Sequence, residues 1–333
     1  MKDWTSHCGE FVKVGSCECG KRFARIIFCG REWCKNCNKI THNRRIARWL
    51  PKALTMQSFG YFVFTIPSEM REFYKSKEHL SQLRTYLRRR LKQVYPNIRA
   101  LSRWHWFGAE SHTYHPHLNI MVDGFQKLSN GELETIKKTY KDALERFTGI
   151  GVKKSSKNLR CKVNVYYHYY SVEGFKKKYA KKHKKISDEQ AKKIFYKARW
   201  DQVVYITRPT FLRYQKELAG KLKGYHNCSC WGQFSELSYE EVEHMAIMRE
   251  TYSKVSQEVI LIESGHCPCC GKKIHWHKKL YPSGICNFGE ELGGGYFMLD
   301  SWPRGSPVKL PERWQIQKAR DENFVSGRIF ADL

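Results

Sequence analysis

The amino-acid sequence predicts an α+β protein with a central antiparallel sheet and flanking helices. The first observation is the order of segments between residues 60 and 209: strand, helix, strand, strand, helix, strand, helix. The second is a pair of neighbouring strands joined by a short turn, which favours antiparallel pairing. The third is the segment 115–122, where polar and apolar residues alternate as in a strand with one face on a core.

Residue type and spacing define each of these elements. The strand segments are rich in β-branched and aromatic residues, and the helical segments carry apolar residues at helical spacing. The last helix starts with a capping box at Ser187 and stops before Pro209. In order, we expect strand 60–66, helix 77–94, strand 104–110, strand 115–122, helix 130–149, strand 162–170 and helix 187–208.

The composition favours a polyanionic partner. The chain of 333 residues has a formal net charge of +28 and 14% aromatic residues, which suits phosphates and unstacked bases. Residues 151–200 contain 16 Lys or Arg against 3 Asp or Glu, which predicts a phosphate-binding track; a solvated basic loop would have the same composition. Without an apolar run of membrane-spanning length or a signal peptide, we expect a cytoplasmic protein with no membrane partner.

Candidate metal ligands lie on the strand 115–122. Alternation puts His115, His117 and Asn119 on one face, while the aliphatic residues between them face the core. The hairpin brings Glu110 near them as a possible further ligand. Imidazole and oxygen donors together suit a divalent cation, and the oxygen donors favour Mg²⁺ or Mn²⁺. The alternative is that both histidines are ordinary surface or turn residues.

The thirteen cysteines predict structural zinc rather than disulfides, given the expected compartment. Cys29, Cys34 and Cys37 have the close spacing of thiolates that share one tetrahedral zinc. Such a short segment has little apolar content, so zinc would supply its folding energy, unless the thiols are simply free. The fourth ligand is open between Cys17 and Cys19, with Cys8 and His42 less favoured.

A second zinc site is expected after residue 225. Cys267 and Cys270 lie in a Cys-Pro-x-Cys-Gly knuckle typical of half a zinc ribbon, and Cys228 and Cys230 are its expected partners.

The predicted organisation is a zinc-binding segment at 1–50, a catalytic domain at 51–225, a zinc-ribbon-like segment with an acidic helical insertion at 226–288, and a tail at 289–333 to which the sequence assigns no role.

Three motifs resemble the HUH-endonuclease initiators of rolling-circle replication in plasmids and viruses. They are the strand Phe62–Pro67, the metal motif His115–Val122, and Cys29-x4-Cys34-x2-Cys37 followed by Arg44-Arg45. The resemblance covers roughly residues 15–235 and implies an HUH nuclease-like fold. The family's metal motif ends in His-hydrophobic-His, whereas this chain has His117-Leu118-Asn119. Asn119 would therefore be a second ligand in a variant site, His115 would substitute for it, or the site would be inactive.

The resemblance also implies a tyrosine nucleophile. Tyr205-Ile-Thr-Arg208 resembles the family's Tyr-x-x-Lys motif, and Asp201 lies one helical turn before Tyr205, where a carboxylate in single-tyrosine initiators is associated with activating water. Tyr170 and Tyr179 are rival nucleophiles, and Tyr205 could instead be a core tyrosine.

The implied activity is site-specific cleavage and rejoining of single-stranded DNA through a covalent 5′-phosphotyrosine with a divalent metal. The implied partners are a single-stranded origin, expected as a hairpin, and host replication proteins such as a helicase. Two other functions remain open: a single-strand DNA transposase of the same chemistry, and a non-catalytic zinc-containing nucleic-acid-binding protein.

Overall fold

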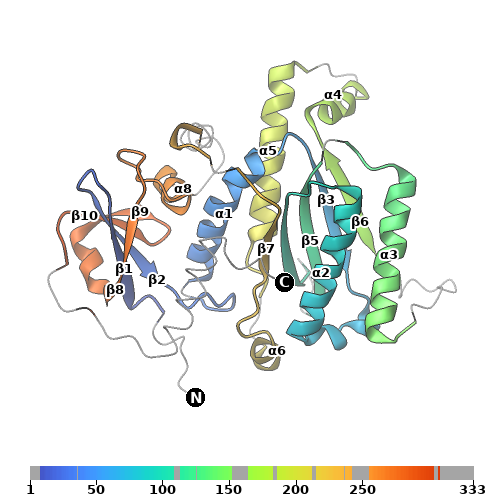
Figure 1. Ribbon diagram of the computed structural model, residues 1–333, viewed down its shortest axis with the longest axis horizontal. Helices are drawn as coiled ribbons and strands as arrows, with labels where there is room; N and C mark the ends of the chain where they lie inside the picture. The colour runs from blue at the N-terminus through green and yellow to red at the C-terminus, as the bar shows by residue number, and fades with distance from the viewer. Residues whose placement is uncertain are drawn as a thin grey trace.

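The protein has two five-stranded antiparallel sheets with helices packed around them, which confirms the predicted α+β class (Figure 1). The structure is a computed structural model that describes residues 8–35, 37–108, 113–124, 126–151, 164–182, 186–211, 215–235, 237–241, 255–303 and 307. None of the helices in these ranges is long and apolar enough to cross a membrane.

The first sheet contains all of the strands predicted between residues 60 and 170. Its strand order is β6-β3-β5-β4-β7, and every neighbouring pair is antiparallel. The predicted hairpin is the β4–β5 pair, and β5 lies at the centre of the sheet. The strands are β3 (Phe59–Thr65), β4 (Ala100–Phe107), β5 (Tyr114–Asp123), β6 (Val165–Tyr170) and β7 (Cys228–Trp231).

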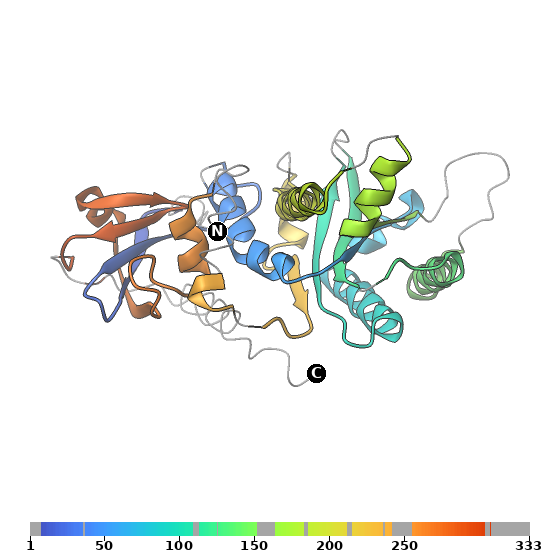
Figure 2. The ribbon, with the colours of Figure 1, turned by 90° about the horizontal axis from the view of Figure 1, so that it is seen from above.

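Helices cover both faces of this sheet, as Figure 2 shows from above. On one face α2 (Lys77–Val94) and α3 (Asn130–Thr148) bury their apolar sides against the strands. On the other face lie α1 (Asn38–Leu54) and α5 (Asp188–Thr207). Each strand of the centre is therefore buried on two sides, and the polar residues of one face lie beneath α1 and α5. The shorter helices are α4 (Val172–Ala180) and α6 (Lys216–Lys221), with 3₁₀ turns at Ser68–Met70 and Phe73–Lys75.

Capping residues fix where the long helices begin. Ser129 and Ser187 each form a capping box with the residue three positions later, so two backbone donors at each helix start are satisfied. Gly149 ends α3 in the left-handed conformation, with φ 67°. The predicted starts of α3 and α5 are confirmed, and α2 has the bounds that its leucine spacing predicts.

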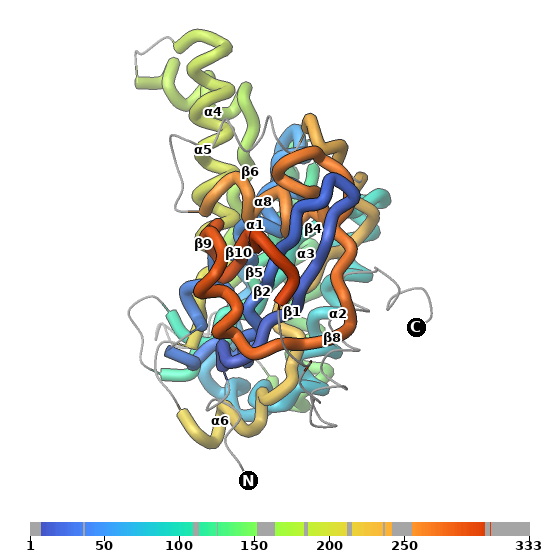
Figure 3. Tube along the Cα trace, turned by 90° about the vertical axis from the view of Figure 1, so that its left-hand side faces the viewer, coloured from blue at the N-terminus to red at the C-terminus, as the bar shows by residue number. Residues whose placement is uncertain are grey.

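The second sheet combines both ends of the chain and was not predicted. Its order is β8-β1-β2-β10-β9, and Figure 3 looks onto it. Residues 289–299, which the sequence left without a role, form a hairpin turning at three consecutive positive-φ glycines, Gly293–Gly295. The elements are β1 (Phe11–Ser16), β2 (Arg22–Ile27), α8 (Gln257–Glu263), β8 (His275–Pro282), a 3₁₀ turn (Ser283–Phe288), β9 (Gly289–Gly293) and β10 (Tyr296–Leu299).

A buried carboxylate joins α1 to this second sheet. Glu263 of α8 accepts two hydrogen bonds from Arg48 of α1 and one from the hydroxyl of Tyr296 on β10. Burial by itself would raise the pKa of Glu263, but the guanidinium groups of Arg48, Arg25 and Arg44 outweigh burial and lower it to about 2.

This pKa predicts how stability depends on pH. A carboxyl with a folded-state pKa near 2 and a usual value of 4.5 stabilises the fold above pH 4.5, and this contribution disappears as the pH falls toward 2. We expect Glu263→Gln to lower the free energy of unfolding at pH 7 by about 3 kcal/mol, and by progressively less below pH 4.5. Urea denaturation between pH 7 and 2.5 measures this, and a difference independent of pH would contradict it.

Candidate active site and metal centres

Two buried histidines lie side by side in the first sheet, beneath the end of α5. His117 and Asn119 share one face of β5, and Leu118 and Ile120 face the core on the other side, as the alternation predicts. His105 of β4 lies opposite His117 in the strand register, with ring centroids 5.2 Å apart. His105 was not identified from the sequence. Its only sequence signal is a position on the strand next to the metal motif.

Each imidazole has one nitrogen committed to a backbone carbonyl. His117 Nδ1 donates to the carbonyl oxygen of His115 at 2.9 Å, and His105 Nε2 donates to that of Ile206 at 3.0 Å. Since a carbonyl only accepts, His117 Nε2 and His105 Nδ1 are left as the nitrogens with a free lone pair. His105 Nδ1 is buried without a hydrogen-bond partner in the described part of the chain. Metal-binding histidines are commonly oriented in this way.

Burial keeps both histidines neutral, as metal ligation requires. Desolvation lowers the pKa of His117 to about 4, with the charge of Arg208 adding to the effect. Desolvation and the neighbouring His117 lower the pKa of His105 well below its usual value. The imidazoles therefore do not need to lose a proton at neutral pH before they bind a cation.

Asn119 supplies an amide beside this pair. Its side chain is fully buried, Oδ1 accepts a 2.8 Å hydrogen bond from the Tyr61 hydroxyl, and Nδ2 has no partner among the described residues. His115 is half-buried, with its ring centroid 5.9 Å from that of His117. Glu110 lies outside the described residues. His105, His117 and Asn119 are thus neighbouring residues of the sheet whose nitrogen and oxygen atoms are of the types that bind divalent cations.

Tyr205 projects from the last turns of α5 toward the histidines. Its ring centroid is 5.4 Å from that of His105 and 6.4 Å from that of Tyr61, and 38% of the residue is exposed. The guanidinium carbon of Arg208 is 4.5 Å from the centroid of the Tyr205 ring. Asp201, one turn earlier, is exposed and pairs with Lys197 at 2.7 Å. An accessible phenol, a cation and two neutral imidazoles therefore converge at one end of the sheet.

The rival tyrosines lie elsewhere. Tyr170 is opposite Phe59 at one end of β3, whereas Thr65, six residues along β3, is opposite His117. At about 3.3 Å per strand residue, Tyr170 is roughly 20 Å from the histidine row. Tyr179 lies on α4, which continues from that distant end of β6. Of the three tyrosines, Tyr205 is the one that the fold brings to the histidines.

Two cysteine tetrads form the candidate zinc centres. Each consists of four sulfur atoms that all lie within 4.8 Å of one another: Cys8, Cys29, Cys34 and Cys37 in the first, and Cys17, Cys19, Cys267 and Cys270 in the second. Sulfur atoms in contact are separated by 3.4–3.8 Å. A tetrahedron with metal–sulfur bonds of about 2.3 Å has edges of about 3.8 Å, so both tetrads fit zinc.

The tetrads keep the predicted groupings of Cys29, Cys34 and Cys37 and of Cys267 and Cys270, but the predicted remaining ligands of both sites are wrong. The fourth thiol of the first site is Cys8, not Cys17 or Cys19, and His42 instead donates to the carbonyl of Val204. The reason is the β1–β2 hairpin, which sets Cys8 beside Cys29 at its open end.

The second zinc site is corrected in the same way. Cys17 and Cys19 lie at the turn of the β1–β2 hairpin, and pairing of β1 with β8 brings Cys267 and Cys270 to that turn. The predicted partners Cys228 and Cys230 lie on β7, in the other sheet.

Zinc content tests the corrected assignment. The wild-type chain should contain two zinc ions, and Cys8→Ser should contain one, because three thiolates hold zinc less tightly than four. Cys230→Ser should keep both ions, since its side chain belongs to neither tetrad. Elemental analysis of the purified variants measures this, and loss of zinc from Cys230→Ser would restore the sequence-based assignment.

Comparison of this chain with protein-family models, with curated proteins and with solved structures gave no match.

Proposed function

We propose that the protein is a metal-dependent, tyrosine-based single-strand DNA endonuclease and strand transferase of the HUH type, which initiates rolling-circle replication. The observation that carries this proposal is the convergence of Tyr205, His105 and His117 at one end of the first sheet. A net charge of +28 supports a polyanionic substrate. The exposed Tyr205 ring is open to a strand that enters from solvent, whereas a core tyrosine would be buried.

In this proposal the divalent cation is held by the two imidazoles of His105 and His117 and by the side-chain amide of Asn119. When bound, the cation supplies neutralisation of charge on the scissile phosphate. Position 119 is asparagine where the family's metal motif has its second histidine. In this proposal His105 on the neighbouring strand β4 supplies that second imidazole instead. Neither His115 nor Glu110 is required in this ligand set.

The chain's own residues account for the covalent step. The Tyr205 oxygen bonds to phosphorus, the bond to the 3′ oxygen breaks, and the departing 3′-hydroxyl gains a proton as the phenol loses one. Arg208, against the Tyr205 ring, stabilises the phenolate and the phosphate charge. The product is a 5′-phosphotyrosine that a later 3′-hydroxyl attack reverses, so cleavage and rejoining use one site.

A covalent adduct is the direct test. The full chain is incubated with a randomised pool of single-stranded oligonucleotides labelled at the 3′ end, because the fragment held by the tyrosine keeps that end. We expect a labelled band that survives denaturation, requires Mg²⁺ or Mn²⁺ and disappears with chelator. Sequencing the trapped DNA would identify the origin. Salt-sensitive binding without any adduct would instead identify a non-catalytic nucleic-acid-binding protein.

A further inference from the structure

The C-terminal end of α5, which carries Tyr205, is held by side chains from two other elements. The last carbonyls of a helix have no partner within the helix, so donors that reach them fix its position. Side chains of α1 and β4 reach four carbonyls here. His42 bonds Val204 at 3.2 Å, His105 bonds Ile206 at 3.0 Å, Arg45 bonds Thr207 at 3.0 Å and Arg103 bonds Arg208 at 3.3 Å.

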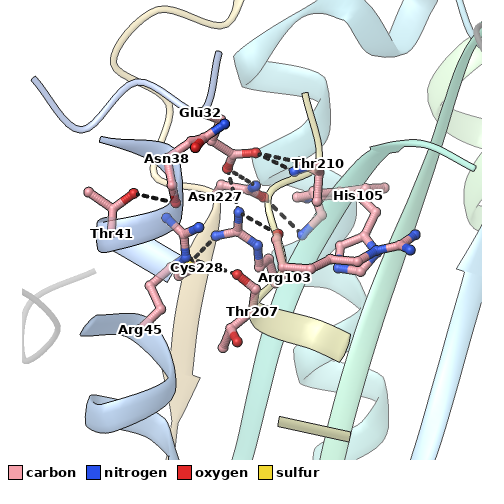
Figure 4. A network of polar contacts seen from close by, with 12 residues as sticks. Glu32, Asn38, Thr41, Arg45, Arg103, His105, Thr207, Thr210, Asn227 and Cys228 are labelled. Atoms are coloured by element: carbon pink, nitrogen blue, oxygen red, sulfur yellow. Dashed lines mark hydrogen bonds and ion pairs between the residues drawn. The ribbon is translucent and has the colours of Figure 1, made fainter. Parts of the chain in front are cut away.

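One carboxylate, Glu32, bonds to Arg103 of this set and to the segment that follows α5, as Figure 4 shows. Glu32 accepts hydrogen bonds from Arg103 Nη2 at 2.6 Å and from Asn227 Nδ2 at 2.7 Å. Its second oxygen accepts from the backbone N–H of Thr210 at 3.2 Å and from the Thr210 hydroxyl. Asn227 Oδ1 in turn accepts from the backbone N–H of Trp104, next to His105 on β4. Glu32 therefore ties the segment after α5 to the strand that carries His105.

Charge makes the carboxylate necessary. Arg103 is buried and Arg45 is half-buried beside it, and desolvation together with the charge of Arg103 lowers the pKa of Arg45 to about 10. Glu32 is the acidic group that faces this pair, with its carboxylate 2.6 Å from Arg103 Nη2. Removing one partner from a buried ion group leaves an uncompensated charge. Without Glu32, the two arginines would repel each other at the base of the tyrosine helix.

Glu32 belongs to the loop of the first cysteine tetrad. It lies between Cys29 and Cys34, both of which contribute sulfur atoms to that tetrad. The same loop contacts the segment after α5 a second time, since the Trp33 and Phe211 ring centroids are 5.0 Å apart. A metal held by Cys29 and Cys34 would therefore fix the loop on both sides of Glu32.

From this arrangement we propose that Glu32 is a positioning residue through which the metal-loaded Cys8–Cys29–Cys34–Cys37 tetrad holds the Tyr205 helix in register with His105. The effect of Glu32 on strand cleavage rests on the proposed function, whereas its role in holding the end of α5 does not. It makes the first tetrad a control point for strand cleavage: loss of its metal releases Glu32, and the nucleophile then moves relative to the histidines. Misplacement of a reacting group by about 1 Å is enough to cost about 10²-fold in rate.

Glu32→Gln tests the clamp, because it keeps the size of the side chain and removes its charge. We expect adduct formation at saturating DNA to slow by roughly 10–100-fold, with DNA affinity and two bound zinc ions unchanged. Glu263→Gln is the matched control, since it removes another buried carboxylate paired with an arginine, and the hydrogen bonds of Glu263 go to α1 and β10 rather than to α5. We expect it to reduce stability and leave the rate unchanged.

Hydrogen exchange at residues 200–210 gives a readout that needs no activity. We expect faster exchange there in Glu32→Gln and in Cys34→Ser, but not in Cys270→Ser, which empties the second tetrad. The double variant Glu32→Gln/Cys34→Ser should exchange no faster than Cys34→Ser, because both changes release the same clamp. Unchanged exchange in Glu32→Gln would overturn the inference. Absence of any wild-type adduct would overturn the proposed function alone, because exchange would still decide the clamp.

Discussion

Tyr205→Phe is expected to eliminate the covalent protein–DNA adduct, because it removes the oxygen that bonds to phosphorus. The ring stays in place, because its contacts with His105, Tyr61 and Arg208 are made by the aromatic ring, which phenylalanine keeps. Stability and DNA affinity should therefore change little, while adduct formation falls below detection, a loss of at least about 10⁴-fold. A denaturing gel of the labelled complex measures the adduct, and a filter-binding titration measures affinity.

The matched controls are the two rival tyrosines. Tyr170 stacks on Phe59, its hydroxyl accepts from Gln202 at 3.3 Å, and it lies at the distant end of β3. Tyr170→Phe and Tyr179→Phe should form adducts at the wild-type rate. Mass spectrometry of the trapped peptide should find the nucleotide on Tyr205. A nucleotide found on Tyr170 or Tyr179 would contradict the assignment and leave the reaction class intact.

Local sequence signals predicted the local structure well. The leucine period of α2, the capping boxes of α3 and α5 and the alternation along β5 are each determined by residues within one element. The face of β5 on which His117 and Asn119 lie is likewise determined by the alternation within that strand. In these segments the physical cause, whether side-chain period or cap hydrogen bond, acts over a few residues and is visible in a single stretch of sequence.

The features that were missed depend on pairing between distant segments. His105 becomes a neighbour of His117 through the β4–β5 register, which the separate strands do not specify. Cys17 meets Cys270 across 253 residues, and no local spacing distinguishes Cys17 from Cys8 as a ligand of Cys29. The glycine-rich residues 289–299 are typical of a loop, and as strands they depend on distant partners: β10 pairs with β2 as well as with β9, and Tyr296 is buried. These features were decided by how strands pair side by side and by contacts between residues far apart in the sequence, rather than by local secondary-structure propensity.

Removing either buried imidazole is expected to abolish metal-dependent cleavage. In His117→Ala the nitrogen with the free lone pair is lost, and in His105→Asn an amide can still donate to Ile206 while the second imidazole nitrogen is removed. We expect adduct formation with Mn²⁺ to fall by at least about 10²–10³-fold in each variant, because the scissile phosphate loses its main charge stabilisation. The double variant should be no worse than either single one, since both act through one bound cation. A Mn²⁺ titration of adduct formation measures this.

His115 and Asn119 separate this ligand set from the alternatives predicted by the sequence. His115→Ala should retain adduct formation, because the hydrogen bond that orients His117 goes to the backbone carbonyl of residue 115, which alanine keeps. Asn119→His replaces a hard oxygen donor with imidazole, so activity should persist and shift toward Co²⁺ or Zn²⁺. Single-strand affinity should be unchanged in both variants, because under the proposed function the phosphate contacts are expected from the cationic surface rather than from the buried pair. Loss of activity in His115→Ala together with normal activity in His105→Asn would make His115 the second imidazole ligand and remove His105 from the site.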